Sequence, residues 1–297
     1  MRQRARALAA LAPLAPILSS PALALAAEEE KFAPQNEFRL DPWIPIEIAG
    51  IDLSINKAVL YLVLASLATC GTMVYIARRM QDKPNRVQTA VEMAYDLASN
   101  TITRQNMDSR MATRWFPFIG TLFLFVWFNN MIGYIPLPTN TEHPVEVLGV
   151  EIPSFALYAA TANFSVPLAL TLVVWFSYHF EGIRAKGVVR YFKGWVPSGV
   201  SGPVTFLVAP IEVISQFLRL ASLSARLFAN MLAGHLLILI MAGGLAVLLG
   251  STIVGFVTLP VGFAFYVFEV GLVASLQAFI FALLSAIYLG EAVAEEH

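Results

Sequence analysis

The last third of the chain is an almost uninterrupted apolar segment that runs from Val204 to Leu289. It is far longer than the roughly 20 apolar residues that a helix needs to cross a bilayer. In lipid, only helices and closed barrels satisfy every backbone N–H and C=O group, and a barrel would require short alternating segments that this sequence lacks. The segment therefore predicts two long, strongly tilted membrane helices that form a hairpin.

The composition of the whole chain agrees with this interpretation. Apolar residues make up 58% of the chain and charged residues 13%, with a formal net charge of -1. A soluble domain of this length would need far more charge on its surface. We expect an all-α membrane protein with about five to six transmembrane or membrane-embedded helices. Because Cys70 is the only cysteine and the four histidines lack ligand spacing, neither a metal site nor a cofactor is expected.

The N-terminus has the layout of a cleaved secretory signal, with three arginines, an alanine- and leucine-rich stretch and a small-residue site that ends at Ala26. Residues 1–26 would then be removed, and residues 27–52 would form a segment on the outer side. An organelle transit peptide and an uncleaved first helix are the alternatives, although the prolines in this stretch oppose a helix.

Residues 53–194 are expected to form three transmembrane spans with an amphipathic connector. The apolar runs place these spans at about 53–76, 116–135 and 155–180 and the connector at 84–114.

Basic residues gather in the loops 78–114 and 184–193, whereas the acidic loop 136–151 contains none. By the positive-inside rule the two basic loops face the cytoplasm or its equivalent, and the N-terminus faces the opposite side. Residues 195–290 would form the tilted hairpin, with breaks at Gly243-Gly244, Gly250 and Pro260. Residues 291–297 are a polar tail whose side of the membrane is left open.

One face of the first long helix carries polar residues. Glu212, Arg219 and Arg226 recur every seven residues and drift by only about 20° per step, and Gln216 and Asn230 lie close to the same stripe. A cation such as Arg226 at mid-membrane costs on the order of 3 kcal/mol, and no acidic residue lies within two turns on its own helix. We therefore expect its partner to come from elsewhere. A structural seam in which Glu212 and Arg219 neutralise each other is the alternative.

His235 falls about 180° from Arg226, on the opposite face of the same helix. The second long helix offers Glu269 and Gln277, and a contact between His235 and Glu269 would create a titratable pair inside the membrane. Such a pair could pass protons, because histidine titrates near neutral pH. A hydrogen-bonded structural histidine is the alternative.

Three ordered motifs resemble subunit a, the membrane stator subunit of rotary (F-type) ATP synthases. The first is SLSARLFANMLAGH at Ser222–His235, the second is Gln277–Phe281 followed by Ile287–Leu289, and the third is Asn130–Pro136. The resemblance covers the chain from about Pro117 to the C-terminus. Two departures are visible, because Ala229 stands where glycine is common and the interval from Glu269 to Gln277 is one residue longer than in relatives.

The resemblance implies a role for each of these residues. Arg226 would face the carboxylate of a rotating ring of c subunits. The outer proton half-channel would be lined by Asn230, His235, Glu269 and Gln277. The inner half-channel, or a polar seam beside it, would contain Glu212, Gln216 and Arg219. Asn130 and Pro136 would belong to a structural motif.

The resemblance also implies a non-catalytic, proton-translocating subunit that assembles with the c-ring, the subunit b peripheral stalk and the remaining ATP synthase subunits. A bacterial inner membrane is expected, with the mitochondrial inner and thylakoid membranes as alternatives. The competing function is a secondary ion-coupled transporter with an intramembrane Arg/Glu binding site. Such folds usually show repeated halves, and we see no internal repeat.

Overall fold

The computed structural model describes residues 38–48, 50–81, 83–147, 150–195, 204–245, 249 and 251–294. The expected leader, residues 1–26, lies outside the described residues. In the described part, five helical segments are long and apolar enough to cross a membrane. They confirm the expected all-α membrane fold.

The first three spans are α4 (Lys57–Arg79), α6 (Ser109–Gly133) and α7 (Ser165–Lys186). Asn56 caps α4 by accepting a hydrogen bond from the Val59 backbone N–H at 3.3 Å, which satisfies one of the first free N–H groups of the helix. The connector contains the amphipathic α5 (Arg86–Asp96) and a π-helical segment, η3 (Leu97–Arg104). Each predicted span is therefore present, although α6 begins seven residues before the expected start at residue 116. Helix α7 begins ten residues after the expected start at residue 155, because residues 155–164 do not join the helix.

The hairpin consists of two compound helices. The first is α9 (Thr205–Leu239), continued by the π-helical η6 (Ile240–Gly244). The second is α11 (Thr252–Phe268), which continues through the π-helical η7 (Glu269–Val273) into α12 (Ala274–Val293). Gly243-Gly244 falls at the end of η6, as expected for a break. Pro260 does not break its helix, because it lies inside α11.

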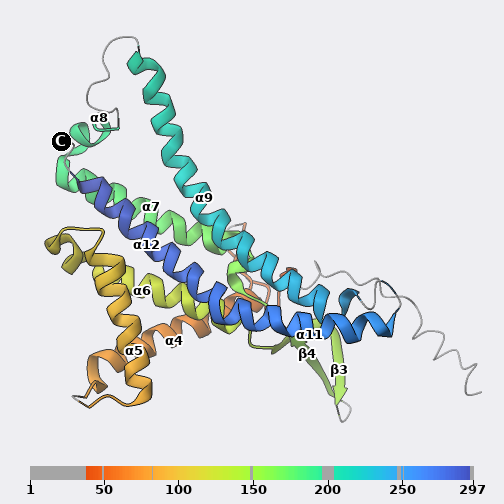
Figure 1. Ribbon diagram of the computed structural model, residues 1–297. Coiled ribbons are helices and arrows are strands. Elements are labelled where there is room, and N and C mark those ends of the chain that lie inside the picture. Colours follow the sequence, from red (N-terminus) through yellow and green to blue (C-terminus); the bar gives the residue numbers. More distant parts are fainter. Residues whose placement is uncertain are drawn as a thin grey trace, which may run out of the picture.

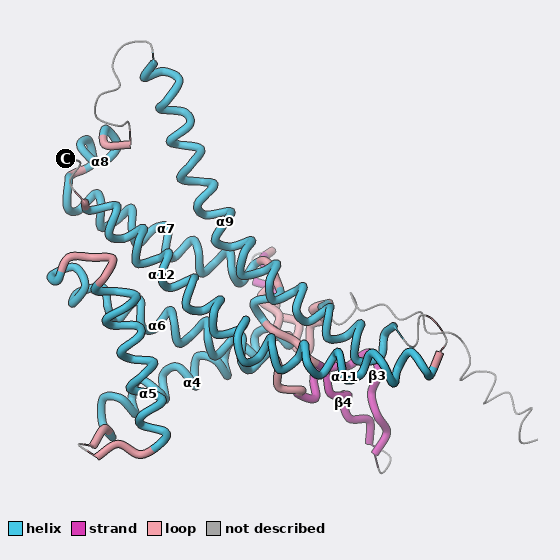
Figure 2. Tube along the Cα trace, in the orientation of Figure 1, coloured by secondary structure: helices cyan, strands magenta, loops and turns pink. Residues whose placement is uncertain are grey.

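The helices form a wedge that opens at one end (Figures 1 and 2). Helix α12 packs against α6 and α7, and α9 packs against α7 and α11. The N-terminal half of α9 diverges from α12, so the hairpin is closed near η6 and open near the start of α9. This divergence leaves room for polar side chains between the two helices at the open end.

The segment expected to be an acidic loop at residues 136–151 is instead a β-hairpin, which corrects that prediction. Strand β3 (Leu137–Val147) pairs with β4 (Val150–Ala156) in antiparallel register, with Leu137 opposite Ala156. A smaller pair, β1 (Glu47–Ile48) and β2 (Ile51–Asp52), precedes α4. The rest of the fold contains the 3-10 turn η4 (Ala160–Ala162) and the short helix α8 (Val188–Lys193).

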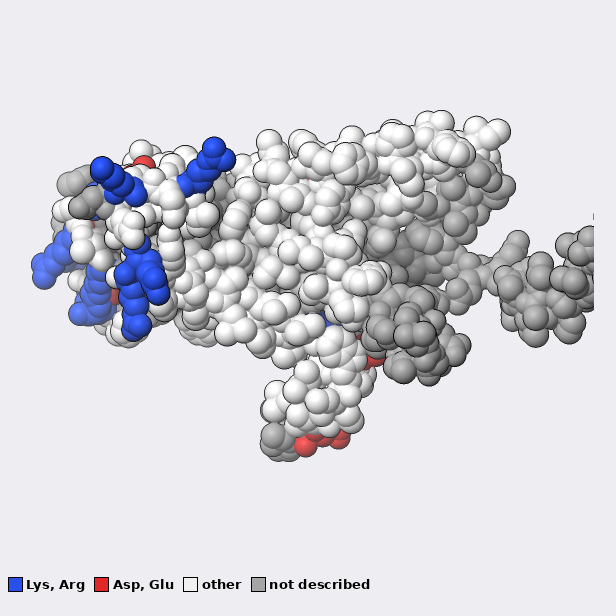
Figure 3. All heavy atoms as spheres, turned by 90° about the horizontal axis from the view of Figure 1, so that it is seen from below, with Lys and Arg blue, Asp and Glu red and all other residues white. Residues whose placement is uncertain are grey.

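Lysine and arginine side chains gather at one end of the molecule (Figure 3). Basic residues close both α4 and α7, and Ala294 at the end of α12 lines the same hollow as Lys186 and Arg190. The positive-inside rule predicts that this end faces the cytoplasm or its equivalent. The C-terminal end of α12 lies at this basic end, so the same rule predicts the inner side for it, which the sequence had left open.

Candidate functional site

Three buried polar side chains meet where α6 ends. The Tyr134 ring stacks on the His235 ring with 4.6 Å between their centroids, and the Tyr134 hydroxyl donates a hydrogen bond to Glu269 Oε2 at 3.0 Å. Tyr134 is 1% exposed, His235 0% and Glu269 8%. Among the described residues no direct hydrogen bond joins His235 to Glu269. The structure thus brings the expected pair together with Tyr134 as the intermediary.

Both ring nitrogens of His235 point at backbone carbonyl oxygens. Nδ1 lies 2.9 Å from the carbonyl oxygen of Met231, and Nε2 lies 3.1 Å from that of Gly133. A neutral imidazole has one N–H group, whereas the imidazolium has two. Only the protonated ring can therefore satisfy both carbonyls at once, and loss of the proton leaves one of them unpaired.

Glycine at position 234 lets the Glu269 carboxylate lie directly against the backbone of α9. A Cβ atom on Gly234 would be 2.5 Å from Glu269 Oε2 and 2.7 Å from its Cδ. Such a contact is shorter than the van der Waals separation of real atoms. Gly234 therefore leaves the space that the Glu269 carboxylate occupies against α9.

Gln277 is 5% exposed and, like Glu269, lies on the buried side of its helix. Eight residues of ideal α-helix would rotate Gln277 by about 80° away from Glu269. The π-helical η7 begins at Glu269 and takes one extra residue into a turn. It therefore keeps both side chains facing the bundle.

Asn130 connects α6 to two other elements. Its Nδ2 donates to the carbonyl oxygen of Ala274 at 3.2 Å, and its Oδ1 accepts from the Thr161 hydroxyl at 2.9 Å. Because Asn130 is completely buried, these bonds satisfy polar groups that would otherwise be costly in the core. Pro136 follows α6 immediately before β3, where the chain turns away from the bundle.

A second set of polar side chains lies at the open end of the wedge. Gln216 is 7% exposed, accepts a hydrogen bond from the Tyr178 hydroxyl at 3.2 Å and donates to Glu212 at 3.4 Å. Arg219 forms an ion pair with Glu291 of α12 at 2.7 Å, and its guanidinium lies over the Tyr288 ring. The alternative in which Arg219 and Glu212 neutralise each other is therefore wrong, because Arg219 pairs across the hairpin.

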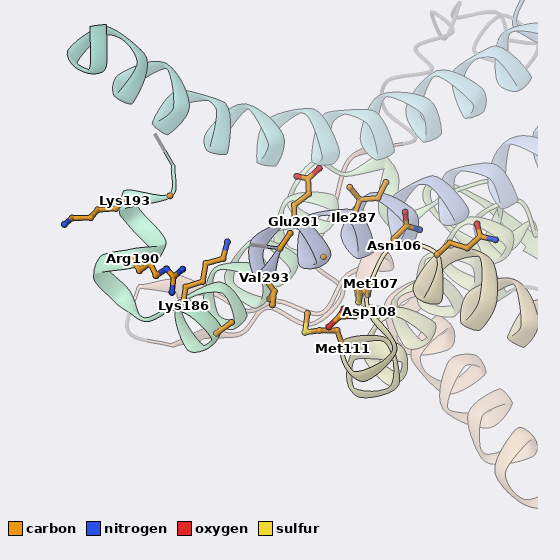
Figure 4. Close-up of a pocket in the computed structure, with 15 residues that line it drawn as sticks. Asn106, Met107, Asp108, Met111, Lys186, Arg190, Lys193, Ile287, Glu291 and Val293 are labelled. Carbon is orange, nitrogen blue, oxygen red and sulfur yellow. The ribbon is translucent and has the colours of Figure 1, made fainter. Parts of the chain in front are cut away.

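These residues border a hollow of about 230 Å³ between α7, α8, α9 and α12. Lys186, Gly194 and Glu291 line both this hollow and a larger one of about 1100 Å³ (Figure 4). In the larger hollow, Lys186 and Arg190 lie on one side and Glu291 on α12 lies above them. The polar set on α9 is therefore reached from the basic end of the molecule through a wide opening.

Arg226 lies on the exposed face of α9. Among the described residues it forms no hydrogen bond or ion pair, in contrast to Arg219. Asn230, one turn further along, is half-buried. The exposed residues beside Arg226 are small, and they are Ser222, Ala225, Ala229 and Ala233.

Apolar side chains separate the two polar sets on the buried face of α9. Leu223 is 2% exposed, Leu227 1% and Met231 0%. They lie between Gln216 and His235, which are about 28 Å apart along the helix axis. The structure therefore offers two polar regions, one that borders the hollow at the basic end and one that is buried where α6 ends, with no continuous polar connection between them along the buried face of α9.

Three residues of these sets did not come from the sequence reasoning, and they are Tyr134, Tyr178 and Glu291. Tyr134 stands inside the quoted Asn130–Pro136 motif, so its position was a usable signal. Glu291 is the first residue of the expected polar tail, but it lies in the last turn of α12 and pairs with Arg219. No sequence pattern indicated Tyr178.

These features define a class of protein, namely a multi-pass helical membrane protein in which one tilted helix carries an exposed arginine between two separate polar regions. The sequence matches the family model described as ATP synthase A chain over residues 59–290. The chain belongs to this family, and it is a non-catalytic membrane subunit of the F-type ATP synthase.

Curated relatives support the same conclusion. Over 267 residues the chain is 34% identical to ATP synthase subunit a of Parvibaculum lavamentivorans, an alignment that covers 89% of this chain and 94% of that protein. It is 33% identical over 267 residues to ATP synthase subunit a of Brucella ovis, with 89% of this chain and 98% of that protein covered. The resemblance stated from the motifs is confirmed, together with a place in an energy-transducing membrane. The roles of the individual residues stay predictions.

Proposed function

We propose that this subunit provides two proton half-channels and presents Arg226 to a carboxylate on a rotating ring of c subunits, so that proton flow drives rotation and ATP synthesis. The observation that carries the proposal is the position of Arg226. It is exposed on the middle of α9 and unpaired among the described residues, while His235 on the opposite face is buried in a polar cluster. A cation left unpaired in a membrane helix needs an anionic partner from outside the chain.

Coulomb's law gives the size of the effect. A carboxylate at about 4 Å from the guanidinium, in an effective dielectric constant near 20, gains about 4 kcal/mol when it ionises. This energy favours release of its proton by about a thousandfold. Arginine suits the task because it stays protonated beside other charges, whereas a lysine can lose its proton.

The outer half-channel would consist of Asn230, His235, Glu269 and Gln277, and the structure supports adding Tyr134 to this set. The inner half-channel would consist of Glu212, Gln216 and Arg219, with Tyr178 and Glu291 beside them. Apolar residues such as Leu227 separate the two sets along α9. A proton would therefore have to leave this subunit, travel on the ring and return, which is the condition for coupling flow to rotation.

The expected partners follow from this arrangement. The small exposed residues beside Arg226, such as Ala225 and Ala229, would allow a ring helix to approach the backbone closely. The subunit b peripheral stalk and the remaining ATP synthase subunits would complete the complex. We assign the protein to a bacterial inner membrane, because the matched relatives come from bacteria. The competing transporter function gains no support from the family or the fold.

The test is proton-driven ATP synthesis in vesicles that contain the assembled complex. Arg226→Ala should abolish synthesis, since nothing then favours discharge of the ring carboxylate. The matched control is Arg104→Ala, which removes an exposed arginine on η3 and should leave synthesis unchanged. Copurification of the ring with both variants would show that assembly is intact. Wild-type synthesis by the Arg226→Ala complex would refute the proposal.

A further inference from the structure

An apolar hollow of about 150 Å³ lies between α4, α5 and α6, away from the polar regions of α9. On α4 it is lined by Met73 and Ile76, on α5 by Val91 and Ala94, and on α6 by residues from Phe116 to Phe128. The lining residues on α6 span about 18 Å along the helix axis. The hollow is therefore narrow and runs along α6 from the basic end of the molecule toward the middle of the membrane.

One side of this hollow is formed by the amphipathic helix α5, which lies at the basic end of the molecule. Helix α5 crosses the direction of α4 and α6 there (Figure 1). Its apolar residues Val91 and Ala94 face the hollow. Its acidic residues are engaged within the same helical segment, because Glu92 accepts a hydrogen bond from Gln88 at 2.6 Å and Asp96 accepts one from Asn100. Such a helix is suited to the boundary between head groups and acyl chains.

Positive charge lies at the ends of the two helices that line the hollow with α6. Arg78 and Arg79 occupy the last turn of α4, two and three residues after Ile76, and Arg86 begins α5 one turn before Ala90. All three arginines are exposed. The acidic residue of this turn, Asp82, lies outside the described residues. Basic pockets at the cytoplasmic side of membrane helices attract anionic lipid head groups.

We propose that this hollow holds part of one acyl chain of an anionic phospholipid whose phosphate lies near Arg78, Arg79 and Arg86. A transmembrane helix of a partner does not fit, because a helix with its side chains is about 10 to 12 Å across. A stretch of methylene chain does fit, since it is narrow and the lining is apolar. The acyl chain would then contact α4, α5 and α6 at once and stabilise the packing of α5 against the two spans. This proposal does not depend on the proton pathway, and its test measures no proton flow.

The test is photolabelling of the full-length chain in vesicles of phosphatidylcholine that contain a small share of a photoactivatable phospholipid. The probe is either phosphatidylglycerol or phosphatidylcholine with the reactive group in the middle of one acyl chain. Labelled peptides are mapped by mass spectrometry. We expect several-fold more labelling of the hollow by phosphatidylglycerol than by phosphatidylcholine, and a substitution of all three arginines by glutamine should remove the difference.

Glycines offer a matched pair of filling variants. Gly120 is buried and borders the hollow, so Gly120→Leu should fill it and reduce labelling several-fold. Gly71 lies on the exposed side of α4, and a Cβ atom at that position would meet nothing within 4 Å, so Gly71→Leu should leave labelling unchanged. If Gly120→Leu does not fold, Ala90→Leu fills the hollow from its exposed rim on α5.

Three results would overturn the proposal. One is equal labelling by the two phospholipids in the unsubstituted protein. Another is labelling that Gly120→Leu and Ala90→Leu leave unchanged. The third is labelling of the isolated chain that disappears in the assembled complex, which would mean that a protein partner covers this surface.

Discussion

Replacement of Gly234 by alanine tests the polar cluster with a change of one methyl group. The new Cβ would lie 2.5 Å from Glu269 Oε2, so the carboxylate would have to move by about 1 Å to reach an ordinary contact distance. The carboxylate is the end of a flexible side chain, and the helices themselves need not shift. We therefore expect the protein to fold and assemble while the hydrogen bond from Tyr134 to Glu269, now 3.0 Å long, is lost.

The magnitude follows from that bond. A hydrogen bond to a charged group contributes about 1.5 to 3 kcal/mol, which corresponds to about a 10- to 150-fold change in rate if the bond holds the carboxylate in its working position. Gly234→Ala should lower proton translocation within that range. Glu269→Asp shortens the side chain by one methylene group, so combining it with Gly234→Ala should restore part of the lost rate.

The assay is ATP-driven proton uptake into vesicles, followed by quenching of a pH-sensitive dye at equal amounts of complex. Gly71→Ala is the control, because a Cβ at Gly71 meets nothing within 4 Å. An unchanged rate in Gly234→Ala would show that the position of the Glu269 carboxylate does not matter for translocation. Strictly additive effects of Gly234→Ala and Glu269→Asp would show that these residues do not act through their contact.

Two further predictions concern the same helices. Tyr134→Phe removes the donor to Glu269 and should slow dye quenching by about 10-fold or more. The control is Tyr158→Phe, which removes a buried hydroxyl that has no partner among the described residues and should leave the quenching rate unchanged. Equal rates in both variants would contradict this. Deletion of Gly271 should convert the π-helical η7 into regular α-helix and preserve assembly of the complex. Deletion of Ile280 should rotate the rest of α12 by about 100° about its axis and prevent copurification of the complex. Loss of assembly in the Gly271 deletion would contradict the second prediction.

The sequence predicted the membrane helices because apolar length and the distribution of charge are local properties. The spans and the hairpin follow from them directly. Helical periodicity also placed Arg226 and His235 on opposite faces of α9, and the structure shows one exposed and the other buried. Periodicity was less accurate for Gln216, which was assigned to the polar stripe of Glu212 and Arg219 but lies buried against Tyr178.

Contacts between distant segments could not be predicted from periodicity. Tyr134 reaches Glu269 across 135 positions in the sequence, and Arg219 reaches Glu291 across 72. Both contacts depend on how α6, α9 and α12 cross, which no single segment determines. The β-hairpin β3–β4 was also missed, because its acidic residues suggested a loop and its pairing depends on register between two strands.

The extra residue between Glu269 and Gln277 coincides with a π-helical segment in the structure. With one residue more than expected, an unbroken α-helix would turn the two side chains toward different faces. The helix changes surroundings at the same place, since α11 is largely exposed, as at Phe256 and Phe263, whereas α12 is packed between α6 and α7. The π-helical η7 absorbs the extra residue at this junction. Glu269 can therefore face Tyr134 while Gln277 faces the bundle, so the additional residue changes the backbone and leaves the polar lining in place.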